Sequence, residues 1–214
     1  MTPSRLLFSI TLPSVALLSL TAPSLATPLA AQATAAAPAP PRPAPRPALR
    51  IMTLTSPAFV DGGDIAVRHA QSGRDVSPPL SWSGVPDSTR SFVLLVHDAD
   101  AAIGDGTDDT LHWLVWNIPD TATGLPEGVP QGPQDADGMR QISASGPYYR
   151  GPAAPASGPR HHYVFELYAL DAMVNVPAAG MSPPATREAV LRAIAGHVRG
   201  KGVLVGLYRR LAPE

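Results

Sequence analysis

The chain has 214 residues, no cysteine, and a nearly even balance of 16 basic and 17 acidic residues. This length is typical of one domain with appendages, and the lack of cysteine excludes disulfides, thiolate nucleophiles and zinc–thiolate centres. The first fifty residues hold four arginines and no acidic residue, which leaves 12 basic and 17 acidic residues in 51–214, a formal charge of −5. Because nucleic-acid binding needs a basic surface, no nucleic-acid partner is predicted.

Residues 1–26 have the three-part pattern of a secretory signal peptide. Arg5 precedes an apolar stretch that ends near Leu20, and a small-x-small sequence ends at Ala26. The alternative is a retained membrane anchor, but Pro13 and several Ser and Thr residues leave the stretch short of the ~20 apolar residues that span a bilayer. We therefore predict cleavage on export, a periplasmic or secreted protein, and no integral membrane segment after cleavage.

Residues 27–50 consist mainly of Ala and Pro, and six of the chain's 26 prolines lie between Pro38 and Pro47. Such a composition cannot bury a core and favours extended polyproline geometry. We predict a semi-rigid spacer here, with a Pro-rich recognition segment as the alternative, and a folded domain over residues 51–214.

From residue 51 onward, short apolar runs alternate with clusters of Gly, Pro, Asp and Ser. The runs are rich in Val, Tyr, Phe and Trp, which is typical of β-strands bounded by turns. The predicted strands cover residues 52–59, 91–97, 111–118, 161–171 and 202–210. One amphipathic helix is predicted within 182–200, starting at Ser182 or Thr186 and ending at Gly200. The predicted fold class is therefore mainly β, mostly antiparallel, with a helix packed on the sheet.

Titratable residues stand at the ends of three predicted strands. Side chains alternate between the two faces of a strand, so Asp98 and Asp100 continue the apolar stripe of the strand over 91–97. His112 shares a predicted face with Leu114 and Trp116. His161 shares one with Tyr163, whereas His162 points the other way.

If these strand ends meet, Asp98, Asp100, His112 and His161 surround a small pocket. Two neighbouring carboxylates need cations or hydrogen-bond donors to offset them, and imidazoles supply both. The alternatives are a solvated turn for the two aspartates and ordinary core positions for the histidines. Before His161, Gly151 and Pro152 belong to a rigid loop whose backbone N–H groups would suit a small anion; a simple Pro-rich turn is the alternative.

Short motifs follow one another along the domain: D-V-S-P-P-L-S-W (75–82), D-x-D-A (98–101), H-W (112–113), G-P (151–152), H-x-Y-x-F (161–165) and Y-A-L-D (168–171). Their order and spacing resemble the phosphatidylethanolamine-binding protein family, in its bacterial Raf-kinase-inhibitor-like branch. The resemblance covers roughly residues 52–210. It implies a large antiparallel sheet, a smaller second sheet, and a few peripheral helices including one near the C-terminus.

The resemblance also implies a pocket for a phosphate-like or other small anion. The positions that match the family's site are Asp98, Asp100, His112, Gly151, Pro152 and His161. Alanines stand at 99, 102 and 154 where the family has prolines, and His162 replaces the usual arginine. Because the titratable groups are retained while stiffening prolines are lost, we predict that the site persists with altered ligand selectivity.

These observations predict a binding module for a small anionic ligand or a phospholipid head group, with no catalytic residue, metal or cofactor assigned. One alternative is a hydrolase that uses an Asp–His pair as general base, with or without a metal ion. Against it, the chain lacks a G-x-S-x-G nucleophile motif. A further alternative is an interaction protein that modulates an unidentified partner through the long segment 119–160.

Overall fold

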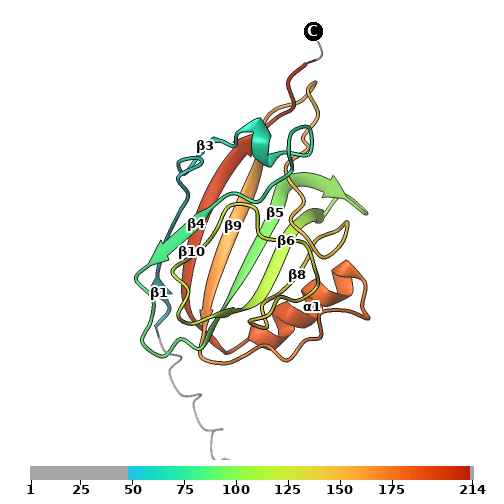
Figure 1. Cartoon of the computed structure of the whole chain (residues 1–214). Helices are drawn as coiled ribbons and strands as arrows, with labels where there is room; N and C mark the ends of the chain where they lie inside the picture. Colours follow the sequence, from blue (N-terminus) through green and yellow to red (C-terminus); the bar gives the residue numbers. More distant parts are fainter. Residues whose placement is uncertain (1–47, 213–214) are drawn as a thin grey trace, which may run out of the picture. The chain divides into compact units, whose positions relative to one another are not determined.

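Two β-sheets form the framework of the part of the chain that the computed structural model describes, residues 48–212 (Figure 1). The large sheet has the strand order β1-β10-β9-β5-β6-β8, with β3 also paired to β10, and the small sheet has the order β2-β4-β7. The large sheet comprises β1 (Arg50–Ile51), β3 (Gly63–Asp64), β5 (Ser91–Ile103), β6 (Asp108–Pro119), β8 (Arg140–Ile142), β9 (His161–Leu170) and β10 (Val198–Tyr208). The small sheet comprises β2 (Thr53–Thr55), β4 (Leu80–Ser83) and β7 (Gly124–Leu125). The predicted signal peptide, 1–26, and residues 27–47 of the predicted spacer lie outside the described residues.

The prediction of a β-rich fold with a large and a small sheet is confirmed. The long strands β5, β6, β9 and β10 pair antiparallel. At the β10 edge, however, β1 and β3 run parallel to β10, which makes the large sheet mixed. The first predicted strand, 52–59, is reduced to β2, because Pro57 has no N–H and the N–H of Ala58 bonds to the hydroxyl of Ser56.

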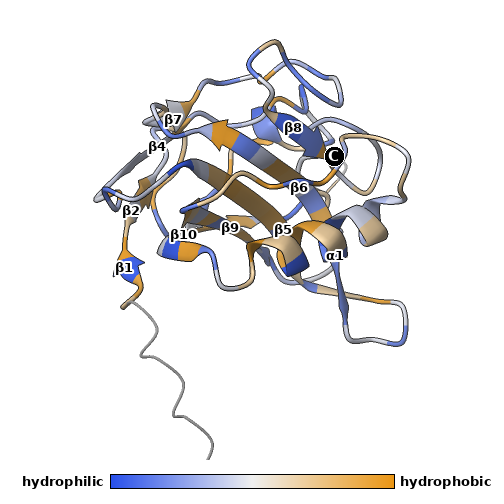
Figure 2. Cartoon of the chain, turned by 90° about the horizontal axis from the view of Figure 1, so that it is seen from below, coloured by the Kyte–Doolittle hydropathy of each residue, from blue (hydrophilic) through white to orange (hydrophobic). Residues whose placement is uncertain are grey.

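Hydrophobic cores lie on both faces of the large sheet. Alternate residues of β5 divide between them: Phe92 and Leu94 belong to the core shared with the small sheet, and Val93 and Leu95 to the core under α1. All four side chains are at most 3% exposed, and burying each contributes roughly 1.5–3 kcal/mol. Figure 2 shows hydrophobic residues along these central strands. The predicted alternation of β5 is confirmed, and it brings the strand to Asp98 with that side chain on the small-sheet face.

The helix α1 (Pro183–Ile194) covers the other face. It begins after Ser182, as predicted, and its buried stripe repeats every four residues, at Thr186, Val190 and Ile194. The predicted end at Gly200 is wrong. Gly196, at φ +85°, ends the helix earlier, and Val198 already pairs in β10. Apart from the 3₁₀ turn η1 (Val67–His69), α1 is the single helix within residues 48–212. No helix in this range has the length and apolar character needed to cross a bilayer.

A β-bulge changes the face on which one predicted site residue lies. Val96 pairs with Trp113 while His97 pairs with Leu111, so His112 is an extra residue in β6. A bulge bends its strand and re-aims side chains. Leu114 and Trp116 consequently pack under α1, whereas the ring of His112 packs against Tyr163 on the small-sheet face. The prediction that His112 shares a face with Leu114 and Trp116 is therefore wrong.

Candidate functional site

Asp98 and His161 form the centre of the candidate site. Asp98 is 4% exposed at the point where β5 pairs with Tyr163 of β9. Nδ1 of His161 donates to Oδ2 of Asp98 at 2.9 Å and lies 3.1 Å from Oδ1. A buried carboxylate is costly unless it is paired and hydrogen-bonded. The His161 imidazole supplies that partner, and its own orientation is thereby set.

Asp100 does not join this pair. Regular pairing of β5 with β9 ends at Asp98, and the ladder with β6 is interrupted between Asp98 and Ile103. The Asp100 carboxylate instead accepts hydrogen bonds from the backbone N–H of His162 and from its Nδ1, at 2.8 Å for the ring nitrogen. These bonds lower the pKa of Asp100 in spite of an opposing effect of burial. Asp100 and His162 thus form a second, more exposed acid–imidazole pair beside the first.

His112 reaches the site from the bulge in β6. Its Nδ1 lies 2.7 Å from the carbonyl oxygen of Arg150, and because a carbonyl only accepts, Nδ1 carries the proton. Burial lowers the pKa of His112, and the Arg150 guanidinium acts in the same direction. At neutral pH the ring is therefore neutral, with Nε2 as a hydrogen-bond acceptor.

Tyr163 was not predicted as a site residue, although it lies two residues after His161 on the same strand face. Its ring packs edge-on against His112 with centroids 5.0 Å apart. The hydroxyl accepts hydrogen bonds from the backbone N–H groups of Ala153 and Ala154, each at 3.1 Å. Burial raises the pKa of Tyr163, and the negative charge of Asp98 adds to that effect. Tyr163 therefore ties the loop after Gly151 and Pro152 to the strand that carries His161.

The Gly151–Pro152 loop is held by a second loop. The N–H of Gly151 donates to Oδ1 of Asp75 at 2.6 Å, and Gln71 bonds to the carbonyl groups of both loop residues. A Cβ on Gly151 would lie 2.2 Å from the carbonyl oxygen of His69, so only glycine fits. The N–H groups that the sequence suggested for an anion are thus bonded within the protein. Neither Asp75, which is half-buried and bonds to the loop, nor buried His69, whose carbonyl lies against Gly151, was predicted.

The structure thus brings together Asp98, His112, His161, Gly151 and Pro152, and directs Asp100 to His162. Both site imidazoles have Nδ1 held by a protein acceptor. Their Nε2 atoms have no hydrogen-bond partner among residues 48–212. An imidazole oriented by a carboxylate can bind an anion or act as a general base. Within the same range, no three His, Cys, Asp or Glu side chains are grouped closely enough to hold a metal ion.

Comparison with known proteins identifies the family. The family model described as phosphatidylethanolamine-binding protein matches residues 55–209. A UPF0098 protein of Methanothermobacter thermautotrophicus is 43% identical over 161 residues, covering 74% of this chain and 99% of that protein. The chain therefore belongs to the phosphatidylethanolamine-binding protein family, and the resemblance found in the sequence is confirmed.

Solved structures agree with this assignment. The crystal structure of a putative phosphatidylethanolamine-binding protein homologue from Chlamydia trachomatis is 31% identical, with a TM-score of 0.63, and the match covers 75% of this chain and 99% of that one. Escherichia coli YbcL, described as a member of the mammalian family, is 25% identical with the same TM-score of 0.63, covering 74% of this chain and 98% of that one. The two-sheet fold is therefore shared with known members.

Proposed function

We propose that the domain is a binding protein whose Asp98–His161–His112 cluster takes a small anion of the phosphate or phosphorylated head-group type. The observation that carries this proposal is the arrangement of the two imidazoles. Each has Nδ1 held by the protein, which leaves Nε2 for a ligand. Family membership supports a ligand-binding role for the site.

The buried carboxylate at the centre would repel an anion if it stood alone. Asp98 is instead engaged by Nδ1 of His161, and a protonated His161 offers Nε2–H to the ligand as a charge-assisted donor. His112, neutral at neutral pH because burial lowers its pKa, accepts a hydrogen bond from a protonated phosphate oxygen. The two rings therefore complement a monoprotonated phosphate group better than a fully ionised one.

Isothermal titration with inorganic phosphate and with phosphoethanolamine tests this proposal. Phosphate affinity is expected to fall as pH rises and the phosphate group loses its remaining proton. His161→Gln is expected to weaken phosphate binding at least tenfold. His197→Gln is the matched control, because the His197 side chain is 49% exposed and paired with Asp171 away from the site. Tighter binding of phosphoethanolamine than of phosphate would indicate a head-group ligand. Phosphate affinity that does not change with pH, or that is equal in His161→Gln and His197→Gln, would refute the assignment.

We further propose that residues 1–26 direct export and that the domain acts in the periplasm or outside the cell. Support comes from the charge, apolar stretch and small-x-small ending of that segment. Expression of the full chain followed by mass measurement of the exported protein tests this. The mature mass is expected to lack about 26 residues, and replacing apolar leader residues with arginine should keep the protein in the cytoplasm. A full-length mass on exported protein would contradict cleavage.

A further inference from the structure

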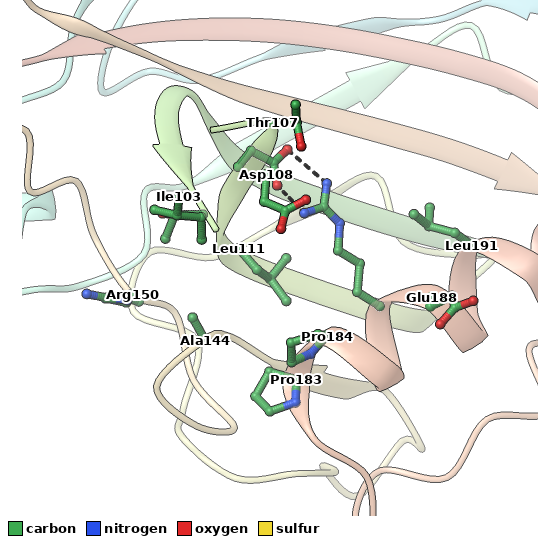
Figure 3. Close-up of a pocket in the computed structure, with 13 residues that line it drawn as sticks. Ile103, Thr107, Asp108, Leu111, Ala144, Arg150, Pro183, Pro184, Glu188 and Leu191 are labelled. Carbon is green, nitrogen blue, oxygen red and sulfur yellow. Dashed lines mark hydrogen bonds and ion pairs between the residues drawn. The ribbon is translucent and has the colours of Figure 1, made fainter. Parts of the chain in front are cut away.

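A groove of about 780 Å³ lies between α1 and the β5–β6 hairpin (Figure 3). It is separate from the site described above, since its floor includes Leu111, which packs in the core under α1, whereas Tyr163 packs in the core on the opposite face of the sheet. The apolar lining comes from both sides of the groove: Ile103, Leu111, Pro183, Pro184 and Leu191. A volume of this size lies within the range of small-molecule sites.

One cation in this groove has no side-chain partner among residues 48–212. Arg150 is half-buried, and Figure 3 shows it on the side of the groove away from Leu191 and Glu188. Its guanidinium makes no ion pair or hydrogen bond with any side chain in residues 48–212. A guanidinium presents a planar fork of donors that matches a carboxylate. Arg150 is therefore the group in the groove that a ligand anion would engage.

The acidic residues of the groove do not compete for Arg150. Asp109 is bound by both terminal nitrogens of Arg187, and Glu188 is paired with Arg192. Asp108, which starts β6, makes no hydrogen bond or ion pair with Arg150 in the part of the chain that the structure describes. None of these three carboxylates therefore engages the Arg150 guanidinium, which stands beside an apolar wall.

We propose that this groove binds an amphipathic monoanion, a carboxylate attached to an apolar body, with Arg150 as the partner of the carboxylate. The apolar body would lie along the wall formed by Ile103, Leu111 and Leu191. The fork geometry of Arg150 and the apolar lining together favour this ligand over inorganic anions, which would gain nothing from the wall.

Arg150 also connects the groove to the candidate anion site through its backbone. Its N–H donates to the carbonyl of His112, and its own carbonyl accepts from Nδ1 of His112. The guanidinium lowers the pKa of His112, in addition to the larger effect of burial. A carboxylate on Arg150 would offset this charge and raise the pKa of His112. By linkage, protonation of His112 would then strengthen carboxylate binding to the same extent.

NMR titration with decanoate tests the proposal. Acetate serves as a probe that lacks the apolar body, and decanol as one that lacks the charge. Decanoate is expected to shift the resonances of Ile103, Leu111 and Leu191 and to raise the pKa of His112. Arg150→Gln is expected to weaken decanoate binding at least tenfold, and Ile103→Ser several-fold, whereas acetate and decanol should bind at least tenfold more weakly. The exposed Arg90, at the opposite end of β5, supplies the matched control Arg90→Gln.

Two results would overturn the proposal: decanoate binding that is equal in Arg150→Gln and the unaltered protein, or groove resonances that decanoate leaves unmoved. Because Arg150 has no side-chain partner in the described part of the chain and Ile103 is 49% exposed, both variants are expected to fold, which their dispersed spectra will verify. The proposal stands apart from phosphate binding at Asp98. A protein that binds phosphate and ignores decanoate refutes this inference alone, and the reverse result refutes the proposed function alone.

Discussion

Replacing His97 by glutamine is expected to destabilise the domain in a pH-dependent way. His97 lies on the α1 face of β5 in a chain of charges that crosses the sheet. Its Nδ1 is 2.6 Å from Oδ2 of Asp109, and its Nε2 is 3.7 Å from Oε2 of Glu166. Asp109 is also held by Arg187 of α1, and Glu166 by Lys201 of β10. A protonated His97 therefore lies between the carboxylates of Asp109 and Glu166, each of which is also paired with a second cation, Arg187 or Lys201.

The size of the destabilisation by His97→Gln follows from the burial of the three side chains and from the ion-pair partners that the carboxylates keep in the variant. The side chains of His97, Asp109 and Glu166 are 17–22% exposed, so solvent screens their interaction only in part. Breaking a fully buried ion pair costs about 3–5 kcal/mol. Because Arg187 and Lys201 still neutralise the carboxylates in the variant, we expect about 1–2 kcal/mol, equivalent to a fall of about 2–8 °C in Tm for a domain of this size.

The pH dependence has a definite sign. Glu166, together with Asp109, raises the pKa of His97 against the opposing effect of burial. A raised pKa in the folded state gives stability that is complete below the unfolded pKa of about 6.5 and is lost as pH rises through the folded value. His97 in turn contributes most to lowering the pKa of Glu166 to about 2. That stability is complete above about pH 4.5 and is lost as pH falls toward 2.

Urea unfolding followed by tryptophan fluorescence at pH 5.5 and at pH 9 measures the effect. The free-energy difference between the unaltered protein and His97→Gln is expected to be about 1–2 kcal/mol at the lower pH and a few tenths at the higher. His197→Gln, which removes an exposed pair with Asp171, should change stability little at either pH. A loss of unfolding free energy in His97→Gln that is equal at pH 5.5 and pH 9, or larger at pH 9, would refute the reasoning.

Other substitutions test the packing around the candidate site. Gly151→Ala is expected to cost about 3 kcal/mol in urea unfolding, because the new Cβ would lie 2.2 Å from the carbonyl oxygen of His69; a near-neutral result would show that the loop relaxes freely. Tyr163→Phe should cost about 1–3 kcal/mol, since two backbone N–H groups lose the hydroxyl that accepts from both; unchanged unfolding would contradict this. Asp98→Asn removes the carboxylate that orients His161 and should weaken phosphate binding at least tenfold at pH 6, measured by calorimetry; undiminished affinity would exclude an orienting role.

The strands and the family were predictable because their signals are local. Period-two alternation placed Phe92 and Leu94 on one face and carried Asp98 to the edge of that core. The same rule placed His161 and Tyr163 together on β9, and the order of the short motifs along the domain matched the family. Each of these inferences needs only the chain's own geometry over a few residues.

Other features of the site depend on contacts between distant segments. The bulge at His112 arises from the register between β5 and β6, so alternation along β6 alone assigned its neighbours to the wrong face. Asp100 turns to His162 because pairing of β5 with β9 stops at Asp98. The N–H of Gly151 is bonded by Asp75, 76 residues away along the chain, and those of Ala153 and Ala154 are bonded by Tyr163 of β9.

The sequence by itself determined the strand pattern, the position of α1, the family, and the residue types of the site, because these follow from composition and short-range periodicity. Only the tertiary structure decided which imidazole meets which carboxylate, where α1 ends, and how His97 and Arg150 are placed. These outcomes depend on strand register and on hydrogen-bond satisfaction between segments far apart in the chain. A shift of one residue in register moves a side chain to the opposite face, and no local pattern encodes that shift.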